Sequence, residues 1–177
     1  LNYHKLILAT GAVPRTLPQV AGLKNARVLR SSDDAAALRR AMQTASSAVV
    51  IGGGYIGLEA AASFSKAGLT VHVVEAADRL LARVASPDIS AFFHDLHQRH
   101  GVMIHTGMTE TKFHQKDDNF TGITLDSGEE VSAELLLIGI GVAPESALAD
   151  VIGADTGNGI LVDCQMRTTI DDVYAIG

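Results

Sequence analysis

A strand, a turn, a helix and a second strand follow one another near the first third of the sequence, and this succession most constrains the fold. A short apolar run at 48–51 leads into a glycine-rich turn at 52–57. An alanine-rich helix is expected over 58–67, and a second apolar run follows at 70–75. Two strands that are joined by a crossing helix pair in parallel. The sequence therefore predicts an α/β fold built on a parallel sheet.

Strands and helices continue to follow one another in the rest of the chain, except over residues 108–131. There, short runs of alternating apolar and polar residues are separated by aspartate-rich turns, which is typical of an antiparallel meander. We therefore expect a Rossmann-like parallel sheet with helices and an antiparallel β-meander crossover. One further helix is predicted to start at 31–34 and end at 42, and another to start at 86–88 and end at about 100. Further strands are predicted at 5–9, 102–105, 135–138, 159–163 and 173–177.

Gly52, Gly54 and Gly57 form the pattern Gly-x-Gly-x-x-Gly, in which each position requires glycine for a different structural reason. The first makes the tight turn after the strand, the second leaves room for a pyrophosphate, and the third lets the helix pack on the strand. The N-terminus of the helix then presents free N–H groups to the phosphates. A preceding strand, a following helix and an acidic residue that ends the next strand supply the context this pattern needs. The alternative is a glycine-rich turn that binds no ligand.

Glu75 ends the second strand at close to the spacing of about 20 residues expected of a carboxylate that binds a ribose hydroxyl. A 2′-phosphate would meet a like charge there, so we expect NADH to be preferred over NADPH. Arg79 and Arg83 follow the strand, where NADPH-selective proteins place arginines. Because they accompany the glutamate and do not replace it, we expect them to contact the pyrophosphate, nearby acids or solvent.

Glu59 lies near the start of the predicted helix and has two possible explanations. A carboxylate is favoured in the first turns of a helix by the helix dipole. It could also face the nicotinamide end of a bound dinucleotide. The spacing alone does not separate the two.

Composition excludes several other classes. The formal net charge of −6 indicates no basic face for nucleic acid. No apolar run approaches the roughly 20 residues that a membrane span requires, so we expect no membrane partner. Cys164 is the one cysteine, which excludes an internal disulfide or CxxC pair and fits a reduced, cytoplasmic setting. His94, His97 and His100 drift around their helix, and no ligand set completes them, so we expect no metal site.

Three segments resemble motifs of the FAD-dependent pyridine nucleotide reductases. Residues 9–15 (ATGAVPR) resemble the ATG motif, residues 52–59 (GGGYIGLE) the NAD-domain fingerprint, and residues 172–177 (DVYAIG) the second FAD motif. Within this family, residues 29–31 and 138–142 are similar to the branch of rubredoxin and ferredoxin reductases that serve ring-hydroxylating dioxygenases and cytochrome monooxygenases.

The resemblance implies a layout and a reaction. Residues 1–25 would end the first segment of an FAD domain, 26–142 would form the NAD(H)-binding domain, and 143–177 would return to the FAD domain. The FAD site would be incomplete, so we expect the chain to be a fragment of a longer enzyme. That enzyme would pass hydride from NADH to FAD and electrons on to a ferredoxin or rubredoxin.

The resemblance also assigns roles to single residues. Tyr55 matches a position that covers the nicotinamide pocket, and Glu59 matches a glutamate close to the nicotinamide. The expected cofactor contacts further include Gly53, Ile56, Gly139, Ile140 and Gly141 for NAD(H), and Thr10, Gly11 and Arg15 for FAD.

Two alternatives stay open on the sequence. One is a related FAD enzyme whose electron acceptor is a disulfide, oxygen or nitrite. The other is a non-catalytic module that senses NADH. Arg15 and the 172–177 run oppose the second alternative, because a sensor has no use for FAD contacts.

Overall fold

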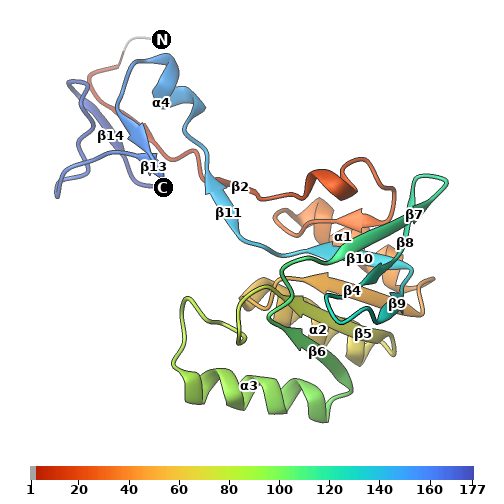
Figure 1. Cartoon of the computed structure of the whole chain (residues 1–177). Coiled ribbons are helices and arrows are strands. Elements are labelled where there is room, and N and C mark those ends of the chain that lie inside the picture. The colour runs from red at the N-terminus through yellow and green to blue at the C-terminus, as the bar shows by residue number, and fades with distance from the viewer. Residues whose placement is uncertain (1–2) are drawn as a thin grey trace. The chain divides into compact units, whose positions relative to one another are not determined.

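The computed structural model describes residues 3–177, and these divide into two compact units. Residues 15–141 form one unit, which we call the sheet unit. Residues up to 14 together with 142–177 form the other, which we call the two-segment unit. Figure 1 gives the order of the elements along the chain. No helix within residues 3–177 is both long enough and apolar enough to cross a membrane.

The sheet unit is built on a five-stranded sheet in which all the paired strands are parallel. In spatial order the strands are β3 (Ala26–Arg27), β10 (Leu135–Ile138), β4 (Ser47–Ile51), β5 (Thr70–Glu75) and β6 (Val102–Thr106). In the central register, Val50 pairs with Leu137 on one side and with Val73 on the other. The predicted Rossmann-like parallel sheet is confirmed.

Three helices follow strands of this sheet: α1 (Ser32–Met42), α2 (Tyr55–Lys66) and α3 (Pro87–Arg99). Ser31 begins α1 with a capping box, and the hydrogen bond from its backbone N–H lowers the pKa of the Asp34 carboxyl. Helix α2 begins at Tyr55, three residues before the predicted start. The prediction was wrong there because the second half of the glycine turn is itself the first turn of the helix.

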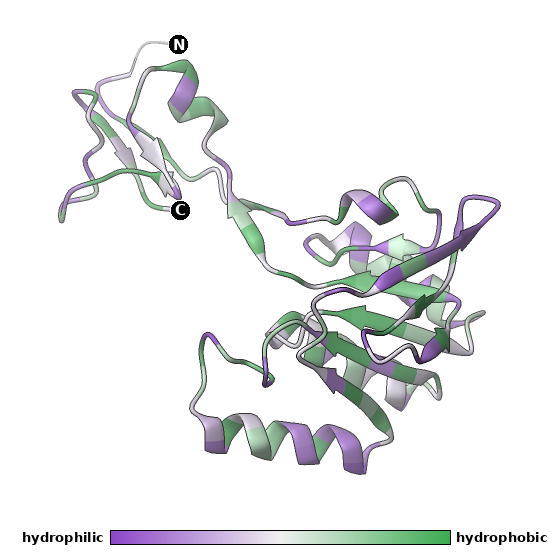
Figure 2. Ribbon diagram, viewed as in Figure 1, coloured by the Kyte–Doolittle hydropathy of each residue, from purple (hydrophilic) through white to green (hydrophobic). Residues whose placement is uncertain are grey.

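Both faces of the sheet are buried. On one face, Val50 and Val73 pack with residues of α1 and α2 in one hydrophobic cluster. On the other face, Val49 and Val74 pack with an antiparallel meander of β7 (Lys112–Lys116), β8 (Asn119–Thr124) and β9 (Glu130–Ser132), and with the short η1 (Pro18–Val20). Burial on both sides explains why the central strands are largely apolar, as Figure 2 shows along β4 and β10. The predicted meander is confirmed.

The two-segment unit has shorter elements. Strand β1 (Leu6–Leu8) pairs in parallel with β14 (Val173–Ala175), and β2 (Ala12–Pro14) pairs antiparallel with β11 (Val142–Pro144). The unit also contains α4 (Ala147–Val151) and the hairpin of β12 (Thr156–Gly157) and β13 (Gly159–Ile160). The strand predicted over 159–163 was wrong beyond Ile160, because Asp163 begins a turn.

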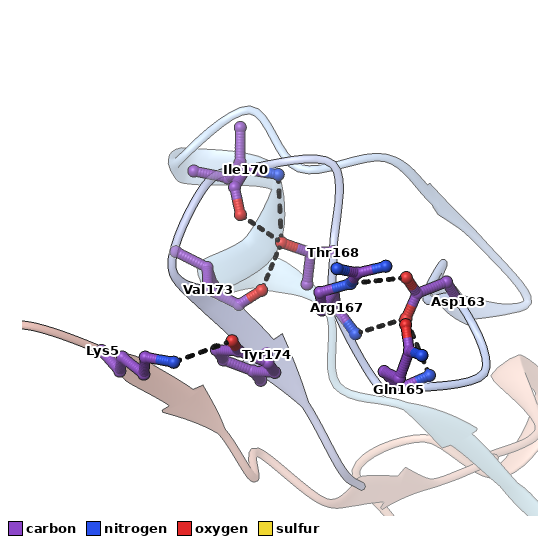
Figure 3. Close-up of polar contacts among 8 residues, drawn as sticks. All are labelled: Lys5, Asp163, Gln165, Arg167, Thr168, Ile170, Val173 and Tyr174. Carbon is purple, nitrogen blue, oxygen red and sulfur yellow. Dashed lines mark hydrogen bonds and ion pairs between the residues drawn. The ribbon is translucent and has the colours of Figure 1, made fainter.

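That turn is held by side chains that bond to the backbone (Figure 3). The Asp163 carboxylate accepts the backbone N–H groups of Gln165 and Arg167 and the Arg167 Nε–H at 2.7 Å. The Arg167 N–H is the main reason why the pKa of the Asp163 carboxyl is lowered. Thr168 continues the pattern by donating to the carbonyl of Val173 at 2.9 Å. The chain therefore enters β14 from a segment fixed by local hydrogen bonds.

Candidate dinucleotide-binding site

The glycine turn brings the carboxyl ends of β4 and β10 into backbone contact. Gly52 has a φ of +108°, and a Cβ on it would collide with the carbonyl of Gly139. A Cβ on Gly57 would collide with the carbonyl oxygen of Gly52. The Gly139 N–H in turn donates to the carbonyl of Ile51 at 2.7 Å. Only glycine fits at 52 and 57, because backbone occupies the space of a side chain.

Gly54 differs from these two glycines, because its surroundings are open. A Cβ on Gly54 would have no heavy atom within 4 Å apart from its chain neighbours. Gly54 is the N-cap of α2, with extended backbone and no side chain to cap the helix. The first turn of α2 therefore begins next to open space at Gly54. Such a helix start next to an open glycine suits an anionic pyrophosphate.

Glu75 at the end of β5 ties that strand to the glycine turn. Its Oε2 accepts the backbone N–H of Gly53 at 2.6 Å, and its Oε1 accepts that of Ala77 at 2.8 Å. A Cβ on Gly53 would lie 3.2 Å from the same Oε2 and 2.6 Å from Cδ2 of Leu80. Each carboxylate oxygen keeps a second lone pair, so Glu75 can hold the turn and still accept a ribose hydroxyl.

The two arginines after β5 differ in their surroundings. The Arg79 guanidinium donates to the carbonyls of Ala82 and Ala85 and to the Ser90 hydroxyl. Arg83 is exposed, and a Cβ on Gly141 would lie 3.5 Å from its guanidinium nitrogen. Arg79 thus contacts its own loop, whereas Arg83 lies beside the segment that follows β10. Nothing in the sequence signals the partnership of Arg79 with Ser90, because the two belong to a loop and a helix that only the fold brings together.

The start of α2 presents three side chains to solvent. Tyr55 is 58% exposed, Ile56 is 38% exposed, and Glu59 is exposed one turn further along. Their helix leaves the glycine turn directly, so all three lie close to the open surface at Gly54. Ile140, on the segment after β10, is half-buried against the cluster on the meander face.

Comparison with known proteins agrees with this geometry. The profile described as pyridine nucleotide-disulphide oxidoreductase matches residues 1–177. Putidaredoxin reductase from Pseudomonas putida is 39% identical over 100% of this chain and 43% of its own length. Rubredoxin-NAD(+) reductase from the same species is 40% identical over 99% of the chain and 46% of its own length. The crystal structure of a ferredoxin reductase for the CYP199A2 system from Rhodopseudomonas palustris superimposes with a TM-score of 0.95, at 40% identity, over 100% of this chain and 44% of that one.

The chain belongs to the pyridine nucleotide-disulphide oxidoreductase family. The resemblance of the three sequence motifs to this family is therefore confirmed, as is the similarity to rubredoxin and ferredoxin reductases. The chain spans less than half the length of these relatives.

The ATG motif, by which the sequence resembles this family, lies at the end of β1. The Thr10 hydroxyl donates to the carbonyl of Glu145, and the Gly11 N–H donates to that of Gly177 at 3.1 Å. Gly11 has a φ of +72°, which suits glycine at this bend. The structure thus brings Thr10 and Gly11 next to the second FAD motif. Arg15 belongs to the sheet unit, where its N–H donates to the carbonyl of Gly141 at 2.9 Å.

In the part of the chain that the structure describes, His94, His97 and His100 belong to no group of side chains that could hold a metal ion. His97 is buried in α3, and burial lowers its pKa, whereas His100 is exposed. Among residues 3–177, no group of three or more histidine, cysteine or acidic side chains is placed to hold a metal ion.

Proposed function

We propose that the whole protein is a flavoprotein reductase that takes hydride from NADH and passes electrons to a ferredoxin or rubredoxin, and that this chain supplies its NADH site. The observation that carries the proposal is the arrangement at the carboxyl ends of β4 and β5. There the Glu75 carboxylate is hydrogen-bonded to Gly53, beside the open surface at Gly54 and the first turn of α2.

The residues present fit an NADH molecule. The pyrophosphate would lie over Gly54 against the N–H groups of α2, with Ile56 and Gly57 in the same first turn. The adenosine ribose would donate its hydroxyls to Glu75. Tyr55 and Glu59 would face the nicotinamide, and Gly139, Ile140 and Gly141 would line the other side of the dinucleotide. Arg83, beside Gly141, is the cation placed to contact the pyrophosphate.

The two-segment unit supports the flavin part of the proposal. Its Thr10 and Gly11 meet the carbonyl groups of Glu145 and Gly177, and these two positions would contribute to an FAD site. We keep the layout in which residues 1–25 and 143–177 belong to an FAD domain and 26–142 to the NADH domain. FAD, when bound, would accept hydride and release electrons singly. The names of the relatives, putidaredoxin reductase and rubredoxin reductase, support an iron–sulfur partner. The cytoplasmic setting rests on the single cysteine, which fits a reduced compartment.

The first experiment tests cofactor choice. NAD⁺ and NADP⁺, which leave the oxidised flavin unchanged and carry the same ribose groups as NADH and NADPH, are titrated by calorimetry into the whole protein and into Glu75→Arg. We expect wild type to prefer NAD⁺ by about tenfold to a hundredfold, because a 2′-phosphate beside a carboxylate costs on the order of a few kcal/mol. Glu75→Arg should shift the preference towards NADP⁺.

Glu130→Arg is the matched control, because it makes the same charge change on an exposed strand of the meander. It should leave both dissociation constants unchanged. Equal affinity of wild type for the two cofactors would contradict the placement of Glu75 at the ribose.

The second experiment tests the acceptor. Steady-state NADH oxidation is measured with a rubredoxin, a [2Fe–2S] ferredoxin, oxygen and a small disulfide as alternative acceptors. We expect one of the two iron–sulfur proteins to give the highest kcat/KM. A higher value with oxygen or the disulfide would favour the corresponding alternative.

A further inference from the structure

The loop between β5 and α3, residues 76–86, forms a wall against the glycine turn. The Leu81 N–H donates to the carbonyl of Gly53 at 2.9 Å, and the buried Leu80 side chain lies where a Cβ on Gly53 would be. Both backbone polar groups of Gly53 are therefore hydrogen-bonded: its N–H donates to Glu75, and its carbonyl accepts from Leu81. The position of residues 80–81 therefore fixes the turn that would receive the pyrophosphate.

This wall is not held by local backbone preference. Leu81 has a φ of +53°, in the left-handed region that residues other than glycine and asparagine rarely adopt. A leucine stays there only when surrounding contacts compensate for the backbone strain, which is on the order of 1 kcal/mol or more. The loop needs an internal support.

Arg79 supplies that support. Its Nη1 donates to the carbonyl of Ala85 at 2.9 Å and to the Ser90 hydroxyl at 2.7 Å, and its Nη2 donates to the carbonyl of Ala82 at 2.9 Å. Ala82 lies within the turn that begins at Leu81, Ala85 lies at its end, and Ser90 lies beyond it in α3. A planar guanidinium with several fixed donors can join them, whereas an ammonium group cannot reproduce this geometry.

Ser90 connects the arginine to the wall. It is buried in the first turns of α3, accepts the Arg79 bond, and donates from its hydroxyl to the carbonyl of Leu80 at 2.6 Å. Hydrogen bonds therefore run from Arg79 through Ser90 to Leu80, whose side chain packs against Gly53. This path accounts for the only serine that is buried among the described residues.

We propose that Arg79 is a positioning residue that acts with Ser90 to hold Leu80 and Leu81 against Gly53, and that it does not bind the dinucleotide phosphates. This replaces the sequence-based expectation of a phosphate contact for Arg79, because two of its nitrogens are committed to loop acceptors. With its charge directed into the loop, Arg79 does not favour a 2′-phosphate, and this sustains selectivity for NADH. The part that concerns NADH rests on the proposed function.

The test compares Arg79→Lys, Ser90→Ala and the double variant in the whole protein. Arg79→Lys keeps the positive charge but loses the fork, and Ser90→Ala keeps the arginine but removes its link to Leu80. Arg99→Lys, on the exposed end of α3, is the matched control. Two quantities are measured: amide hydrogen exchange of the segment 80–84 without ligand, and the NADH dissociation constant at low and high salt.

We expect Arg79→Lys to speed exchange of this segment by about tenfold or more and to raise the NADH dissociation constant by about tenfold at both salt concentrations. The limiting rate of flavin reduction at saturating NADH should stay within about twofold, which a general loss of folding would not allow. Ser90→Ala should give a smaller effect in the same direction. The double variant should lose less than the sum of the two single losses, because both act through one network.

Unchanged exchange in Arg79→Lys would overturn the proposal. So would an NADH dissociation constant that is unchanged although exchange becomes faster, because the loop would then not position the turn that receives the pyrophosphate. If wild type binds no NADH, the proposed function fails, while the exchange measurement still decides the role of Arg79.

Discussion

The two units of this chain are built by different means. In the sheet unit, β4 is covered on both faces, and Val49 and Val50 are both fully buried. In the two-segment unit, β1 buries Leu8 but leaves Ile7 59% exposed, and α4 ends with Val151 82% exposed. Its small core consists of Leu8, Ala149, Ala154, Val173 and Ala175. The sheet unit therefore depends on long-range burial, and the two-segment unit depends more on local hydrogen bonds.

This contrast has consequences for stability. Apolar burial stabilises in proportion to the area removed from water, at roughly 25 cal/mol per Å². Segments with few buried contacts open at lower free energy than a central sheet. We therefore expect the two-segment unit to open first and the sheet unit to determine the global unfolding transition.

The largest expected effect comes from a matched pair of leucine truncations. Leu137 is fully buried in β10, between β3 and β4, whereas Leu8 lies in the small core of the two-segment unit. Leu137→Ala should lower the free energy of unfolding by about 4–5 kcal/mol, near the upper end of such truncations, because the covered sheet cannot collapse into the cavity. Leu8→Ala should lower it by about 2–3 kcal/mol, measured by urea denaturation. Equal losses of unfolding free energy would mean that both cores resist collapse around a cavity to the same extent. That result would contradict the difference between the two units.

A second pair separates folding from binding within the glycine turn. Gly57→Ala should lower the free energy of unfolding by about 1–3 kcal/mol, since its Cβ would collide with the carbonyl of Gly52. Gly54→Ala should leave unfolding unchanged within about 0.5 kcal/mol, because its Cβ would meet open space. The same Gly54→Ala should weaken NADH binding by about tenfold or more, because the methyl group takes the space of the pyrophosphate.

Calorimetry and urea denaturation on both variants test this separation. If Gly54→Ala binds NADH as wild type does, the pyrophosphate does not lie over Gly54. If Gly57→Ala is as stable as wild type, the backbone contact between Gly52 and Gly57 is not required.

The same contrast explains what the sequence could predict. Strand β5 was predicted at its observed bounds, 70–75, because burial on both faces makes an apolar run that ends sharply. Gly52 and Gly57 were recognised because backbone contacts leave room for glycine alone, and Gly54 because it stands at a fixed spacing from them in a position with open space. By contrast, β2, β11 and α4 were not predicted, because they are three to five residues long and carry no periodic signal.

Single contacts in the site escaped prediction for a related reason. The expectation for Arg79 came from its distance along the chain from Glu75, and spacing does not say which way a long side chain turns. Its direction depends on Ser90 and on the carbonyls of a loop whose shape follows from tertiary packing. Sequence spacing predicted which residues would form the candidate site, and only the fold distributes the two arginines between different contacts.

The smallest expected effect is a difference between the units in their response to acid. In the sheet unit, His72 on β5 is half-buried, and its Nδ1 lies 3.0 Å from Nε2 of His105. Burial, and then the neighbouring His105, lowers the pKa of His72 below its ordinary value of 6.5. In the two-segment unit, the hydrogen bond from the Arg167 backbone lowers the pKa of Asp163 below 3.8.

The two shifts act in different pH ranges. The unfolded chain binds a proton at His72 more readily than the folded chain, so the stability that neutral His72 contributes is present above pH 6.5 and is lost as the pH falls below it. The contribution of ionised Asp163 is present above pH 3.8 and is lost only as the pH falls through its lower folded value. Between about pH 7.5 and 5.5, only the sheet unit should weaken.

Urea denaturation at these two pH values should show a loss of unfolding free energy that is a fraction of the ~1.4 kcal/mol of one pKa unit, because His72 is partly solvated. His72→Gln should reduce this loss, and His114→Gln on the outer strand β7 should not. A wild-type midpoint that is the same at both pH values, or one that His114→Gln alters as much as His72→Gln, would remove the histidine pair as the cause.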